Sequence, residues 1–136
     1  MTASAGYSGT PLPAKLGIRA GSRVLLDGAP ARLPLEPLPE GVTVHRRPGH
    51  VPYDVVLLFA ARAARLQERW PVLVSRVVTA GRLWVCWPKK AAGVPTDLTE
   101  AVVRRHGLDA GLVDVKVCAV DVTWSGLAFV RRVRDR

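Results

Sequence analysis

The stretch Tyr53-Asp54-Val55-Val56-Leu57-Leu58-Phe59 decides the fold class of this 136-residue chain. It is an almost continuous apolar run of strand length, rich in β-branched and aromatic side chains. A strand that is apolar on both faces is typical of a parallel sheet covered by helices on both sides. We therefore expect residues 53–59 to form a central strand of an α/β protein.

The segment that follows this strand, residues 61–80, has the spacing of an amphipathic helix. Pro71 interrupts the segment, so we expect either a kink or two successive helices, with Gly81 ending the second. The apolar side chains that fall on one side of this expected helix are Leu66, Trp70, Leu73, Val74 and Val77.

The C-terminal half of the sequence predicts a strand, a helix and a hairpin. Residues 82–87 form an apolar run of strand length. Thr96 or Asp97 is expected to cap the next helix, which ends at Gly107 after a last turn containing His106. Alternating residues 113–119, the polar stretch 121–126 and the apolar run 127–133 then predict an antiparallel hairpin.

The N-terminal part predicts an arm followed by two short strands. Residues 1–22 form the expected arm, and within it residues 11–16 make a short helix ended by Gly17. Residues 22–26 and 42–45 are β-rich, whereas the passage between them, 28–41, contains too many prolines for a helix. We expect residues 23–136 to form a single domain.

Strand, strand, strand, helix, strand, helix and hairpin are the elements of a three-layer α/β fold. The expected sheet is Rossmann-like and mostly parallel, has five to seven strands, and ends in a C-terminal antiparallel hairpin. This order resembles the body of a Rossmann-like methyltransferase over residues 23–133. The resemblance implies a cofactor site at the carboxyl ends of the first strands.

That cofactor site departs from the usual pattern at two places. A nucleotide site of this kind needs several glycines after the first strand, and here only Gly28 follows it closely. The second strand is followed by His45-Arg46-Arg47, where an acidic residue would receive ribose hydroxyls. We therefore expect a degenerate, methyltransferase-like site and assign no cofactor.

An anion site is predicted where the strand 82–87 leads into the next helix. Lys89 and Lys90 carry positive charge, and the helix start at Thr96 and Asp97 offers N–H groups and a positive dipole end. Plain capping by Asp97 explains the helix start equally well. The aromatic side chains expected to wall the pocket are Tyr7, Trp87 and Trp124.

Nucleic-acid binding is an alternative, because the chain has 20 Lys and Arg against 11 Asp and Glu and a net charge of +9. A continuous helix over 61–80 would gather Arg62, Arg65, Arg69 and Arg76 into a stripe able to follow phosphates. Sixteen of the cations are arginines, however, and four lie among the last six residues, so much of the charge can be compositional.

Three blocks of sequence resemble a small actinobacterial family of unknown function. They are residues 6–12 (GYSGTPL), residues 87–100 from Trp87-Pro88-Lys89-Lys90 to Glu100, and residues 113–127 with Thr123-Trp124-Ser125-Gly126. The resemblance spans nearly the whole chain and implies no known activity, catalytic residue or cofactor. Val122 follows Asp121 where the family has an acidic pair, which weakens a catalytic role for that loop.

Other classes of site find little support in the residues. The three histidines and two cysteines lack metal-ligand spacing, and Cys86 and Cys118 suit buried, reduced thiols. No apolar run is long enough to span a bilayer, so we expect a cytoplasmic protein without a membrane partner. The terminal hairpin offers an edge on which a homodimer can form.

These features give a first hypothesis and two alternatives for the function. The first is a non-enzymatic binding or regulatory module for an anionic small molecule or an acidic protein surface. The alternatives are an enzyme with a remodelled, methyltransferase-like site and a nucleic-acid-binding protein.

Overall fold

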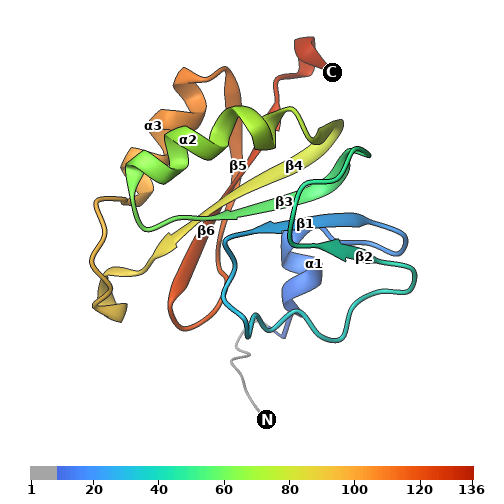
Figure 1. The fold of residues 1–136 in the computed structure, drawn as a ribbon, viewed down its shortest axis with the longest axis horizontal. Coiled ribbons are helices and arrows are strands. Elements are labelled where there is room, and N and C mark those ends of the chain that lie inside the picture. Colours follow the sequence, from blue (N-terminus) through green and yellow to red (C-terminus); the bar gives the residue numbers. More distant parts are fainter. Residues whose placement is uncertain (1–8) are drawn as a thin grey trace.

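The computed structural model describes residues 9–136, which form a six-stranded sheet with helices on both faces (Figure 1). The strand order is β2-β1-β3-β4-β6-β5. Strands β2, β1, β3 and β4 run parallel, and β6 and β5 form an antiparallel hairpin at one edge. The expected α/β class, the mostly parallel sheet and the C-terminal hairpin are all confirmed.

The parallel half of the sheet is made of short N-terminal strands and longer central ones. Strands β1 (Arg23–Asp27) and β2 (Thr43–His45) lie next to β3 (Tyr53–Phe59), which coincides with the apolar run that predicted it. Strand β4 (Val77–Pro88) completes this half. Every residue of β3 except Asp54 is buried, as expected of a central strand.

Two helices cover one face of the sheet, and a shorter one lies on the other (Figure 1). Helix α2 (Ala63–Val74) and helix α3 (Glu100–Asp109) pack on the first face, where Leu66, Leu73 and Val103 are buried. Helix α1 (Leu12–Leu16) covers the second face, and the Trp84 indole N–H there donates to the carbonyl of Leu16 at 3.0 Å.

The connection between β1 and β2 contains no helix, as its prolines predicted. Its apolar side chains nevertheless contribute to the second face: Leu35 is buried, and Leu33 and Leu38 pack against the same cluster as Val24 and Leu26. The second face of the sheet is therefore covered by an extended segment and a five-residue helix.

The expectation of a helix over residues 61–80 ended by Gly81 is wrong. Helix α2 ends at Val74 and contains Pro71, and the chain is already in strand β4 at Val77. Pro71 removes one backbone hydrogen bond of the helix, and the β-branched run from Val77 to Thr79 favours a strand. The guanidinium of Arg131 caps the C-terminal end of the helix by donating to the carbonyl of Val74, its last residue, at 3.1 Å.

Helix α3 also differs from its prediction at both ends. Thr99 caps it by accepting from the Val102 N–H at 3.2 Å, so neither Thr96 nor Asp97 is its cap. Gly107 does not end the helix but lies inside it. The Phe129 ring occupies the space that a side chain at Gly107 would need, which explains the glycine at this position. Here glycine allows close packing of helix on sheet.

The hairpin consists of β5 (Leu112–Ala119) and β6 (Trp124–Arg131), joined by a polar turn. The Asp121 carboxylate holds this turn by accepting from the N–H groups of Thr123 and Trp124, both at 2.8 Å. Strand β5 is the outer strand, and its register with β6 shifts between Asp114 and Lys116. Short 3-10 helices, Lys90–Ala92 and Val133–Asp135, complete the described chain.

Candidate functional site

The carboxyl ends of the parallel strands are where ligands bind in open α/β sheets. In this protein that edge has two parts. One part lies after β1 and β3, near Asp27 and Phe59, and we call it the β1 end. The other lies after β4, near Lys89 and Lys90, and we call it the β4 end.

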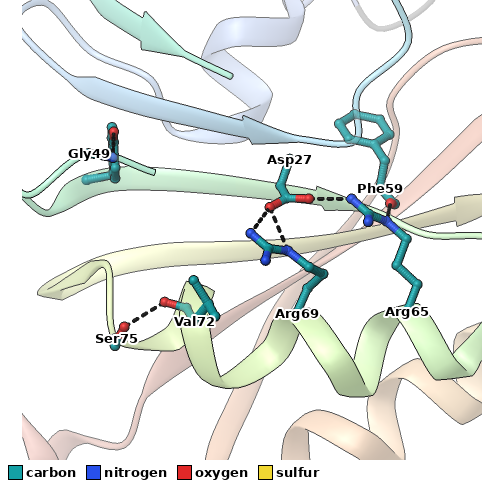
Figure 2. A network of polar contacts seen from close by, with 8 residues as sticks. Asp27, Gly49, Phe59, Arg65, Arg69, Val72 and Ser75 are labelled. Carbon is teal, nitrogen blue, oxygen red and sulfur yellow. Dashed lines mark hydrogen bonds and ion pairs between the residues drawn. The ribbon is translucent and has the colours of Figure 1, made fainter. Parts of the chain in front are cut away.

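At the β1 end, the carboxylate of Asp27 binds two guanidinium groups. Arg65 donates to Asp27 Oδ1, and Arg69 donates to Asp27 Oδ2 through Nε at 3.0 Å and through Nη2 at 2.6 Å. Arg65 Nε also donates to the Phe59 carbonyl at 3.0 Å. Figure 2 shows both arginines rising from α2 toward the end of β1. We call Asp27, Arg65 and Arg69 the Asp27 cluster.

Strand and helix periodicity place these three side chains together. Alternation along β1 puts Asp27 on the same face as Leu25, which is the face that α2 covers. Arg65 and Arg69 are four residues apart on α2 and therefore lie on one side of it. A helix packed on the sheet at this point thus presents two arginines to one carboxylate.

The Asp27 carboxylate is largely removed from water, whereas the two arginines are not. The Asp27 side chain is 8% exposed, and the side chains of Arg65 and Arg69 are 37% and 26% exposed. A buried carboxylate requires paired charge and hydrogen bonds, and the two guanidinium groups supply both. The cluster carries a net charge of +1, because two cations face one anion.

Gly28, which follows Asp27, leaves the space that the Arg65 guanidinium occupies. It has φ +74°, a left-handed conformation that suits glycine, and an added Cβ would meet the Arg65 guanidinium and lie 3.0 Å from the Phe59 carbonyl oxygen. The single glycine after the first strand thus makes room for an arginine of this chain.

At the β4 end, the predicted anion-site residues have different hydrogen-bond partners. Lys89 is half-buried and its backbone N–H donates to the Thr123 carbonyl at 2.7 Å, whereas Lys90 is exposed at the start of a 3-10 helix. The Thr96 hydroxyl donates to the Ala61 carbonyl at 2.6 Å, and the Asp97 carboxylate accepts from the Ala63 N–H at 2.8 Å. Thr96 and Asp97 therefore bind the start of α2.

The three predicted pocket walls have different environments. Trp87 is 6% exposed and belongs to the core cluster under α2 and α3. Trp124 is half-buried on the other face, where its ring meets Phe59 edge-on at a centroid distance of 5.2 Å. Tyr7 lies outside the described residues.

The four arginines of the expected basic stripe are divided among different roles. Arg65 and Arg69 bind Asp27, and Arg62 is exposed immediately before α2. Arg76 lies beyond the end of α2 and is half-buried, so it is not on the helix at all. The structure brings only Arg65 and Arg69 together.

The cysteines are poor candidates for nucleophiles. Both are free thiols, and Cys86 is fully buried while Cys118 is half-buried. Burial raises the pKa of Cys86 well above its ordinary value, with the nearby Cys118 and Asp121 adding to the effect. Burial also raises the pKa of Cys118, against the opposing charges of Lys15 and Lys116. A raised pKa disfavours the reactive thiolate form.

The described part of the chain contains neither a cluster of metal-ligating side chains nor a helix suited to span a membrane. Within residues 9–136, no three His, Cys, Asp or Glu side chains gather as a metal would require. None of the helices there is both long enough and apolar enough to cross a bilayer.

Comparison with solved structures identifies methyltransferases as structural neighbours. Magnesium protoporphyrin IX methyltransferase from Synechocystis PCC 6803, solved with bound S-adenosylmethionine, has a TM-score of 0.60 at 15% identity, covering 83% of this chain and 71% of that one. The N-methyltransferase NodS from Bradyrhizobium japonicum WM9 has a TM-score of 0.58 at 13% identity, covering 87% and 90%. An S-adenosylmethionine-dependent methyltransferase from Aquifex aeolicus has a TM-score of 0.57 at 14% identity, covering 85% of each chain.

At these identities the likeness establishes the fold, which is a methyltransferase-like Rossmann fold. No protein-family model and no curated protein matches the chain. The resemblance to the actinobacterial family therefore stays a prediction.

Sequence reasoning missed the Asp27 cluster, although two signals for it were present. An aspartate at the end of an apolar strand is expected to be partly buried and to need a counter-charge. Two arginines four residues apart, each adjacent in sequence to a buried residue of α2, lie close to the sheet-facing side of the helix. Taken together, these signals predict an ion pair.

Proposed function

We propose that this protein is a methyltransferase-like protein with a remodelled ligand site, which binds a small molecule at the β1 end. The observation that carries the proposal is the Asp27 cluster, a net positive group at the edge of the sheet where this fold binds ligands. The similarity to methyltransferases supports a remodelled site of this kind more than it supports the non-enzymatic module expected first from the sequence.

S-adenosylmethionine does not fit this site in the usual way. The space beside Gly28, where a nucleoside would approach the backbone, contains the Arg65 guanidinium. Asp27 already binds two arginines, and the end of β2 presents His45, Arg46 and Arg47 in place of a carboxylate for ribose hydroxyls. S-adenosylmethionine carries a positively charged sulfonium group, which the net positive charge of the Asp27 cluster would repel.

The residues of the cluster can bind and orient an anionic group. Each guanidinium offers planar, paired N–H donors of the geometry that carboxylates and phosphates accept. Asp27 is not placed to act as a general base, because its oxygens already accept from Arg65 and Arg69. Its role in the remodelled site is to hold the two arginines.

A panel of ligands tests the proposal by thermal stability. It contains S-adenosylmethionine, S-adenosylhomocysteine, nucleotides, phosphate esters and acyl-CoA compounds. A ligand at 100 times its dissociation constant stabilises the folded state by about 2.7 kcal/mol. We expect an anionic member of the panel to raise the melting temperature, and Gly28→Val to abolish that rise because it displaces Arg65. The proposal fails if no compound shifts the transition.

The second candidate function is that of a methyltransferase that uses S-adenosylmethionine. The structural neighbours of this protein favour that function. It requires Arg65 and Arg69 to release Asp27 before the cofactor binds. Under this alternative, S-adenosylmethionine or S-adenosylhomocysteine raises the melting temperature of the wild type, and Arg65→Ala strengthens their binding. The remodelled site predicts no shift with either compound.

The predicted site at Lys89 and Lys90 remains a competing location for an anion. The paired substitutions Lys89→Ala and Lys90→Ala should leave binding unchanged if the β1 end holds the ligand. A loss of binding in this variant would instead assign the ligand to the β4 end.

A further inference from the structure

Hydrogen-bond donors remain unused in the Asp27 cluster. A guanidinium has five N–H donors. Arg65 uses Nε for the Phe59 carbonyl and Nη2 for Asp27, and Arg69 uses Nε and Nη2 for Asp27. Within residues 9–136, neither Nη1 atom has a hydrogen-bond partner. The side chains of Arg65 and Arg69 are 37% and 26% exposed, so each guanidinium is in part accessible to a ligand from solvent.

A third cation approaches the same end of the sheet. The Arg46 guanidinium reaches from the segment after β2 to the carbonyl of Ala29 at 3.5 Å, two residues beyond Asp27. The exposed Gly28 lies between these points, and the Arg65 guanidinium lies against it. The turn after β1 is thus flanked by positive charge from two different elements.

We propose that the outer N–H groups of Arg65 and Arg69 bind the phosphate group of a phosphate monoester, with Asp27 as their positioning residue. The inference rests on the proposed function and names the ligand class of that same site. A phosphate matches the planar donor pairs of two guanidinium groups and the surplus charge of the cluster. Asp27 fixes both groups in advance, which lowers the entropy lost on binding.

The positioning role of Asp27 separates this site from an ordinary basic patch. Flexible surface arginines lose rotamer freedom when they bind an anion. In this cluster, the carboxylate already holds Arg69 by two nitrogens, and the Phe59 carbonyl adds a second contact to Arg65. Recognition should therefore depend on guanidinium geometry as well as on charge.

The test is a calorimetric titration of the full chain with adenosine 5′-monophosphate, inorganic phosphate and uncharged adenosine. We expect the nucleotide or inorganic phosphate to bind, and adenosine not to bind. The nucleotide alone binding assigns an organic monoester, and equal affinity for both assigns the phosphate group by itself. Arg69→Gln should weaken binding about tenfold, since it removes a charge-assisted hydrogen bond.

Matched variants distinguish the cluster from general electrostatic attraction. Arg62→Gln removes one exposed arginine next to the same helix and should change affinity less than about twofold, as expected for a screened surface charge. Arg69→Lys keeps the charge but not the fork, and should still weaken binding several-fold. Equal losses in Arg62→Gln and Arg69→Gln would overturn the proposal.

Chemical-shift mapping on the wild-type protein gives a result that needs no variant to fold. Phosphate should perturb the backbone N–H of Gly28 and the side-chain Nε–H of Arg65 and Arg69 more than the backbone N–H groups of Lys89 and Lys90. The opposite order overturns the inference. If phosphate ligands fail while another anionic compound of the panel binds at Gly28, this inference fails and the proposed function stands. If no compound binds, both fail.

Discussion

The two ends of the ligand edge differ in how their charges are held. At the β1 end, Asp27 is buried and joins Arg65 and Arg69, which come from a helix 38 and 42 residues further along the chain. At the β4 end, Lys89 and Lys90 lie at the start of a short 3-10 helix, and Thr96 and Asp97 bind the start of α2. The lysine pair of the β4 end is easily visible in the sequence. Among the described residues of the two ends, however, ion pairs hold the charged side chains only at the β1 end.

The largest expected difference between the ends is in stability. Asp27→Ala should lower the free energy of unfolding by about 2–4 kcal/mol, because it leaves two partly buried arginines without their counter-charge. The double variant Lys89→Ala and Lys90→Ala should change it by no more than about 0.5 kcal/mol, as is usual for surface positions. Urea denaturation measures both. Similar losses in the two variants would remove the distinction.

A pair of glycines sharpens the same comparison. Gly28 at the β1 end and Gly93 at the β4 end have φ of +74° and +71°, but only Gly28 has neighbouring atoms within 4 Å of an added Cβ. Gly93→Ala should therefore cost only the left-handed backbone strain, about 1 kcal/mol. Gly28→Ala should cost about 2–3 kcal/mol, since the Arg65 guanidinium must also move. Denaturation midpoints that shift equally would show that Arg65 is not constrained there.

The hydrogen bond from Ala63 to Asp97 connects the β4 end to helix α2, and removing it tests whether the β1 end and the β4 end are independent. Asp97→Ala should lower the free energy of unfolding by about 1 kcal/mol, because it removes the side-chain acceptor at the start of α2. It should also weaken ligand binding at Arg65 and Arg69, which lie on the first turns of that helix. Thr99→Ala, which uncaps α3 instead, is the control and should leave ligand affinity unchanged.

The smallest expected effect is a loss of stability at low pH. It should be the same in variants of the β1 end and of the β4 end, because His106 belongs to neither. Burial lowers the pKa of His106, whose ring packs on Trp70 at a centroid distance of 4.6 Å. The unfolded state, with a pKa of about 6.5, then binds the proton more readily, so stability is full above that pH and falls as the pH drops through the lower folded-state pKa. His106→Phe should flatten this fall between about pH 7 and pH 5 in urea titrations. An unchanged slope in His106→Phe would mean that another group is responsible.

The elements that local patterns specify were predicted well. The run from Tyr53 to Phe59 forms β3 with those same bounds, and the prolines between residues 28 and 41 leave that connection without a helix. In both cases a property of the segment itself decides its secondary structure. For residues 53–59 this property is apolarity on both faces of the strand, and for residues 28–41 it is the missing backbone N–H of the prolines.

Features decided by distant contacts were predicted poorly. Val77 fits a helical apolar face as well as it fits a strand, and its pairing with Tyr53 in β3 decides between them. In the sequence alone, Gly107 resembles a residue that ends a helix. The structure shows that it is a glycine because the Phe129 ring packs against it. Asp27 is separated from Arg65 and Arg69 by 38 and 42 residues, so their pairing follows from packing α2 on the sheet and not from any motif.

The Asp97 carboxylate makes the amide proton of Ala63 a reporter on the loop that precedes α3. The first amide protons of a helix have no partner within the helix and normally exchange rapidly with solvent. Ala63 donates to Asp97, so its exchange should be slow and should follow the opening of that loop. Its protection factor therefore measures how firmly the β4 end holds the helix on which the β1 end depends.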